Sequence, residues 1–298
     1  MILDKKSPTN TQNRVSVFPF SKGGGDTRLK RPLADLDSVL PGAKETVHKL
    51  QKARQESFTS LSKGAYNPWE RYHKSFKLHQ AGPSWIVHTK DASFSEGIIK
   101  EITGHKSDME RISASQSDKL VLLREAIYHD AAIFFVYEIM DVSLAQIFNS
   151  PLGRLQLFEV AAFSRELLAG VEYIHKSLGI SHGGVSSTSV LLSVSGAVKI
   201  GTSMLENTSI NESQKDLEAI GNIIIECLEP ITFLRDGRSL LSNWGRDLSD
   251  FVECTKAKPV EVIIKHDFLQ LSPGPSCLKP YIRLARESAA KQVEVNKL

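Results

Sequence analysis

The segment Ser181–Leu192, SHGGVSSTSVLL, has the small and hydroxylated residues of a tight loop in which a functional site could be built. Its one titratable side chain is that of His182, and from residue 177 to residue 198 the chain has no Asp, Glu, Lys or Arg. Such a loop offers hydroxyl groups and an imidazole, but no carboxylate to orient an attacking hydroxyl or to hold a hard metal ion. The sequence therefore predicts a loop without catalytic charge of its own.

Length and composition indicate a folded chain. It has 298 residues, of which 41% are hydrophobic and 24% charged, as in ordinary globular proteins, and the length suits one medium domain or two lobes. A net charge of +3 without a clustered basic face argues against a nucleic-acid partner. The apolar runs are too short to span a bilayer and no secretory signal is evident, so we expect no membrane partner and a cytoplasmic or nuclear location.

The cysteines indicate reduced thiols and not a metal centre. Cys227, Cys254 and Cys277 are odd in number, widely spaced and outside any CxxC pattern. We therefore predict no bound metal.

The chain divides by pattern into four parts. We expect residues 1–70, rich in Ser, Thr, Lys, Gln and Gly, to be mostly disordered, with a short helix, frayed or docked, within residues 43–61. From about residue 75 to Met140, short β-type runs alternate with turn residues, which predicts a small antiparallel sheet.

After Met140 the pattern becomes helical. Apolar residues at helical spacing predict a long helix that ends near Gly179, and DLEAIGNIIIECL predicts a buried helix from Asp216. Between them, SVLLSV and AVKIG predict a hairpin that turns at Ser195 and Gly196.

In this order the elements resemble the protein kinase family from about residue 75 to residue 269. The segment FFVYEIM is similar to the fifth strand and hinge with Tyr137 as gatekeeper, and VIIKHDFL is similar to the motif that closes the kinase domain. Several further positions align with kinase motifs: His182, Gly183, Gly184 and Ser189 with the H-R-D-L-x-x-x-N loop, residues 202–204 with D-F-G, and Asp216 and Gly221 with D-x-W-S-x-G. The departures are similar to those of degenerate kinase-like chains of filamentous fungi.

The resemblance implies an α+β, bilobal protein-kinase-like fold. Its N-lobe would be small and antiparallel β-rich over residues 71–140, and its C-lobe mainly helical over residues 141–270, with a truncated activation segment. The truncation follows because only thirteen residues separate Thr202 from Asp216. In the tail, residues 271–298, we expect a short helix. It could dock on the larger lobe or stay solvated, and we favour the solvated helix.

The resemblance also implies that phosphoryl transfer chemistry is absent. That reaction needs a carboxylate to orient the acceptor and metal ions to neutralise charge on the phosphates. The carboxylate position is Gly184, and the two metal-ligand positions are Ser189 and Thr202, so we predict no catalytic residue and no metal ligand. We expect the His182 side chain to pack inside the fold. Because Ser203 replaces the phenylalanine of D-F-G, we also expect the two lobes to be loosely coupled.

The nucleotide pocket is expected to be compromised. No G-x-G-x-x-G stands between the first two strands, where HQAGPSW has Gly82 followed by Pro83. Lys100 matches the lysine of V-A-I-K, with Glu110 as its candidate partner, although a strand lysine with a solvated tip is an alternative. Ile98 would crowd the adenine site. The candidate cofactor-binding residues are Lys100, Glu138, Met140 and Leu191.

From the resemblance we expect a pseudokinase that binds another protein, a kinase being one option, with no required cofactor. Weak, metal-independent ATP binding stays open. The alternatives are an unorthodox nucleotide-dependent phosphotransferase using displaced residues and a decaying gene product with a poorly stable C-lobe. Asp216 is expected to be a buried carboxylate that accepts backbone N–H groups from the His182 loop.

Overall fold

The computed structural model describes residues 61–79, 81–112, 115, 117–151, 154–201 and 213–295. All of them belong to the second of two units, Ser57–Leu298. Residues 1–60, with most of the helix expected there, and positions 202–204 lie outside the described residues.

The strand-rich part is a mixed six-stranded sheet with strand order β1-β5-β6-β4-β3-β2. Its strands β2 to β6 pair antiparallel, as expected, whereas β1 pairs with β5 in parallel. Two short helices, α2 (Pro68–Arg71) and α3 (Lys106–Arg111), accompany the sheet. The strands are β1 Ser62–Ala65, β2 Tyr72–His79, β3 Pro83–Thr89, β4 Glu96–Thr103, β5 Leu123–His129 and β6 Ala132–Tyr137.

Two predictions need correction here. The sheet is mixed and not antiparallel throughout, and the predicted boundary at residue 70 falls too late, because β1 and α2 precede it. The β1 sequence SKGA is short and has no apolar alternation, so it carries no local strand signal.

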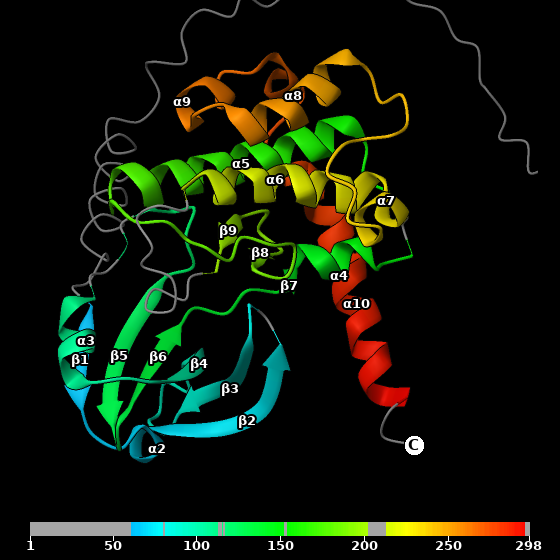
Figure 1. Ribbon diagram of the computed structural model, residues 1–298. Coiled ribbons are helices and arrows are strands. Elements are labelled where there is room, and N and C mark those ends of the chain that lie inside the picture. Colours follow the sequence, from blue (N-terminus) through cyan, green and yellow to red (C-terminus); the bar gives the residue numbers. More distant parts are fainter. Residues whose placement is uncertain are drawn as a thin grey trace, which may run out of the picture. The chain divides into compact units, whose positions relative to one another are not determined.

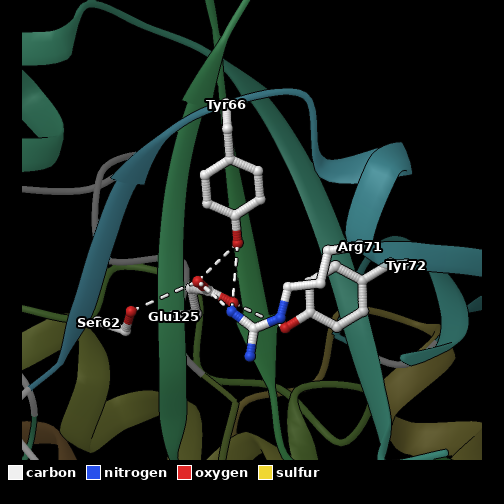
Figure 2. Close-up of polar contacts among 5 residues, drawn as sticks. All are labelled: Ser62, Tyr66, Arg71, Tyr72 and Glu125. Atoms are coloured by element: carbon white, nitrogen blue, oxygen red, sulfur yellow. Dashed lines mark hydrogen bonds and ion pairs between the residues drawn. The ribbon is translucent and has the colours of Figure 1, made fainter. Parts of the chain in front are cut away.

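A buried carboxylate on the neighbouring strand, Glu125, fixes β1 and α2 to the sheet. Glu125 is 4% exposed, and its oxygens accept hydrogen bonds from the hydroxyls of Tyr66 and Tyr72, both at 2.7 Å. Arg71 forms an ion pair with it at 3.0 Å, and the Ser62 hydroxyl lies 3.4 Å away. Figure 2 shows these four side chains converging on the carboxylate. Since a buried charge needs such partners, they hold β1 and α2 in place.

The helical part is built around two long helices, α5 (Leu157–Lys176) and α6 (Ser213–Leu228), which lie side by side in Figure 1. Both match the prediction, and the expected hairpin is present as β8 and β9, with Gly196 in its turn at φ +95°. The remaining elements are β7 Val142–Ser143, α4 Leu144–Phe148, β8 Val190–Leu192, β9 Val198–Ile200, α7 Pro230–Leu234, α8 Arg246–Ala257, α9 Val260–Ile263, the 3-10 helices η1 Asp267–Leu271 and η2 Pro275–Leu278, and α10 Lys279–Val295.

The apolar core of the helical part forms where α5, α6 and α8 meet. Phe163 on α5 and Phe251 on α8 are fully buried in it. Gly221 on α6 permits the close approach of α8, because a Cβ there would lie 2.4 Å from Thr255 Oγ1. The glycine is thus explained by helix packing.

The C-terminal tail is docked and not solvated, contrary to our expectation. Leu278 and Ile282 are fully buried and Ala285 is 2% exposed, all within the helical core. The hydroxyl of Tyr281 donates to Glu159 on α5 at 2.8 Å. The tail has few apolar residues, but these three stand at i, i+4 and i+7, so they share one face of the chain.

Replacing the buried Ile282 with alanine tests the docked tail. We expect Ile282→Ala to lower the free energy of unfolding by about 2–5 kcal/mol, because it leaves a cavity in the core. Arg283→Ala, a change at the exposed neighbour, is expected to cost less than about 0.5 kcal/mol. Denaturant unfolding measures both, and equal small effects would contradict the docked tail.

Candidate functional site

The His182 loop is fixed by the Asp216 carboxylate, which is 1% exposed at the start of α6. Asp216 accepts the backbone N–H groups of His182 and Gly183 at 2.7 and 2.8 Å, and His175 Nε2 lies 2.8 Å from it. Burial alone would raise the pKa of this carboxyl, but these hydrogen bonds outweigh burial and lower it. The expected role of Asp216 is confirmed.

The His182 ring ties the loop to the end of β9. Its Nε2 lies 2.9 Å from the Gly201 carbonyl, and its Nδ1 accepts the N–H of Gly184 at 3.2 Å. The imidazole is therefore neutral with its proton on Nε2. Burial lowers the pKa of His182, against the opposing effects of the Gly201 carbonyl and Asp216. These contacts give His182 a structural role. The prediction that the two lobes couple loosely rests on Ser203, which lies outside the described residues.

The loop serines hydrogen-bond within the fold. Ser189 is 6% exposed, and its hydroxyl lies 3.1 Å from the carbonyls of Gly184 and Ser186. The backbone N–H of Ser186 also donates to that hydroxyl, at 2.9 Å. Ser187 donates to Glu226 at 2.8 Å. The hydroxyls of Ser187 and Ser189 therefore form hydrogen bonds within the fold. Gly184 has no side chain that could act in catalysis.

Three of the four predicted cofactor-binding residues, Lys100, Glu138 and Leu191, line one small cavity. Met140 is 3% exposed in the same apolar core but does not line the cavity. The cavity leaves about 10 Å³ for the centre of a water molecule, which is room for about one water. Its other lining residues are Ile98, Val121, Tyr137 and Gly201. Sites for drug-sized ligands are roughly 300–1,000 Å³, so a nucleotide base does not fit.

Ala81, in the turn just before β3, contacts two of the residues that line this cavity, Lys100 and Gly201. The Ala81 N–H donates to the Thr188 carbonyl at 3.1 Å, which joins the turn to the His182 loop. The Lys100 ammonium donates to the Ala81 carbonyl. On the other side, a Cβ added to Gly201 would lie 2.9 Å from the Cβ of Ala81, so the two backbones approach closely. Ala81 has a positive φ of +49°, which is uncommon for alanine.

The charged groups around this small cavity have partners of their own. Glu138 pairs with Lys199 at 2.5 Å and accepts the N–H of Leu122 at 2.8 Å. The Lys100 ammonium also lies 5.8 Å from the centroid of the Tyr137 ring. Its candidate partner Glu110 is exposed on α3, where its backbone carbonyl accepts from Lys63 at 2.8 Å.

The structure also brings together Asp250, Cys254 and His266, whose ligand atoms lie within 4.8 Å of one another. Sequence spacing did not suggest this group. A histidine that binds a metal normally donates a proton from its other nitrogen, but His266 Nδ1 accepts the N–H of Phe268 at 3.2 Å. Nε2 then carries the proton and faces Asp250 at 3.1 Å. The geometry fits a His–Asp hydrogen bond better than a metal centre.

No protein-family model matches the chain, and no curated protein matches it. Within the part of the chain that the structure describes, every helix is too short or too polar to cross a membrane.

Removing the Asp216 carboxylate tests its role in the loop. We expect Asp216→Ala to lower the free energy of unfolding by about 1–3 kcal/mol, because two backbone N–H groups lose their acceptor. Glu218→Ala, on the same helix but with a less buried side chain, is the control and should cost less than about 0.5 kcal/mol. An unchanged melting temperature for Asp216→Ala would reject the assignment.

The lowered pKa of His182 predicts a pH dependence. The unfolded chain takes up the proton at the ordinary histidine pKa of 6.5, whereas the folded chain resists it. Stability is therefore lost as the pH falls below 6.5, until the folded pKa is passed. Between pH 7.5 and 5.5 we expect His182→Gln to lose less stability than the parent chain, by up to about 1 kcal/mol. Parallel pH profiles in denaturant unfolding would contradict this.

Proposed function

We propose that this chain is a protein-kinase-like module that does not transfer phosphate and acts by binding another protein. The observation that carries the proposal is the small size of the cavity between Lys100, Glu138 and Leu191, where the family resemblance implies a nucleotide. Ala81, from the chain itself, lies against that space.

The order of elements supports the family part of the proposal. A strand sheet is followed by a connecting segment at Glu138, a long helix α5, the His182 loop, a hairpin and the buried helix α6. Asp216 at the start of α6 holds the backbone of the loop. This order of elements supports the family part of the proposal.

The electrostatics support the non-catalytic part. Phosphoryl transfer depends on positioning and on charge neutralisation by metal ions held by carboxylates. Among the described residues that line the cavity, the carboxylate is that of Glu138, and Lys199 already neutralises it. Losing one electrostatic group of the transition state typically costs 10²- to 10³-fold in rate.

One observation favours the alternative of an unorthodox phosphotransferase, namely that Lys100 does reach the cavity. For a nucleotide to enter, the Ala81 turn would have to leave both the Thr188 carbonyl and the Lys100 ammonium. Because two hydrogen bonds hold the turn in its present position, we favour the non-catalytic function.

Thermal unfolding with nucleotide tests the proposal. With ATP or ADP at about 1 mM, with and without Mg²⁺ or Mn²⁺, we expect the melting temperature to rise by less than about 1 °C, because a site that is not formed gives little linkage stabilisation. An active protein kinase serves as the positive control. A metal-dependent rise of several degrees would favour the enzyme, and the absence of cooperative unfolding would favour a decaying gene product.

A further inference from the structure

Two histidines lie side by side at the edge of the six-stranded sheet. His73 on the edge strand β2 and His88 on β3 are paired in the register of the two strands, so their side chains point to the same face. Their rings are stacked, with centroids 5.0 Å apart and planes 21° from parallel. His73 is exposed and His88 is half-buried. An ion from solution can therefore reach both imidazoles.

A serine hydroxyl orients the His88 ring. Its Nδ1 lies 3.1 Å from the Ser75 hydroxyl oxygen. When Nδ1 carries the proton and donates to that oxygen, the lone pair of Nε2 is available to a metal ion. Histidines that bind metals are commonly oriented in this way, by a hydrogen bond from the nitrogen that does not bind the metal. His266 has the opposite arrangement, since its Nδ1 accepts a backbone N–H.

A carboxylate extends this row of side chains onto the next strand. Glu96 on β4 is paired with His88 in the register, so its side chain lies on the same face of the sheet. Arg124 donates to the backbone carbonyl of Glu96 at 2.7 Å, but the carboxylate has no hydrogen bond or ion pair with any described residue. Lys74, the neighbour of His73, lies on the other face, with its Nζ 3.8 Å from the centroid of the Trp69 ring. Two imidazoles and a carboxylate thus stand side by side on three adjacent strands.

We propose that His73 and His88 together bind one Zn²⁺ ion, with Glu96 as the third protein ligand. Zn²⁺ accepts imidazole and carboxylate ligands, and three protein ligands with a water are common in its open sites. To form bonds of about 2.0–2.1 Å the stacked rings must tilt toward each other, which the rotation of side chains at the surface allows. An ion held there links the edge strand β2 to β3 and β4. The proposal is independent of the function proposed above.

The spacing of the two histidines along the chain does not reveal this pair, because they lie on different strands. The prediction of no bound metal was based on the cysteines and on the kinase-like positions, and not on these side chains.

Isothermal titration calorimetry of the full chain with ZnCl₂ tests this site. We expect His73→Gln and His88→Gln each to weaken Zn²⁺ binding at least about 10-fold, because each removes a ligand. If the two imidazoles bind one ion, the double variant should be less than about 2-fold weaker than either single variant. Glu96→Gln should weaken binding at least about 3-fold. Unchanged affinity in any of these variants, or independent and additive effects of the two histidines, would overturn the proposal.

The control variants are His129→Gln, at a histidine elsewhere in the sheet, and Cys254→Ser, in the group with Asp250 and His266. Both should alter Zn²⁺ affinity less than about 2-fold. Mg²⁺ at about 1 mM should not compete, because it is a hard cation that prefers oxygen ligands. A loss of binding in Cys254→Ser would overturn the proposal.

NMR of the imidazole groups tests the site in the parent chain, so this readout does not depend on whether a variant folds. We expect Zn²⁺ to shift the ring resonances of His73 and His88 together, at one ion per chain. Absent Zn²⁺ binding, or a shift of only one of the two rings, would contradict a shared ion.

Discussion

The Asp216 carboxylate is the constraint on which the His182 loop depends. By accepting the N–H groups of His182 and Gly183, it fixes the backbone of a loop whose one titratable side chain is a neutral imidazole. The fixed loop presents the Thr188 carbonyl to the Ala81 N–H of a turn more than a hundred residues earlier in the chain. A buried carboxylate on α6 thereby supports a contact between the helical part and the sheet.

Charged groups beside the small cavity have partners within the chain. Lys100 donates to the Ala81 carbonyl, and Glu138 pairs with Lys199. Because charged groups taken partly out of water need partners, these contacts stabilise the chain around the small cavity. In the function proposed above, contacts within the chain stand where the resemblance implies contacts to a ligand.

Strong local patterns in the sequence predicted the helices and the hairpin. The features that sequence analysis missed depend on long-range contacts. Helices α5 and α6 and the β8–β9 hairpin follow from apolar periodicity and a turn glycine, and the resemblance placed Lys100, Glu138 and Leu191 together. By contrast, β1 contacts the distant Glu125 and had no local signal, and the docking of the tail helix depends on its contacts with the helical core, which local spacing does not reveal. The position of Ala81 beside Lys100 and Gly201 depends on its positive φ and on the Thr188 carbonyl, neither of which spacing reveals.

Hydrogen exchange at the Ala81 amide tests the central claim most directly, since this amide joins the turn before β3 to the His182 loop beside the small cavity. Because the amide donates to the Thr188 carbonyl at 3.1 Å, we predict that it exchanges at least about 100-fold more slowly than an unprotected amide. Asp216→Ala should reduce this protection. Exchange of the Ala81 amide at the unprotected rate in the parent chain would contradict the account.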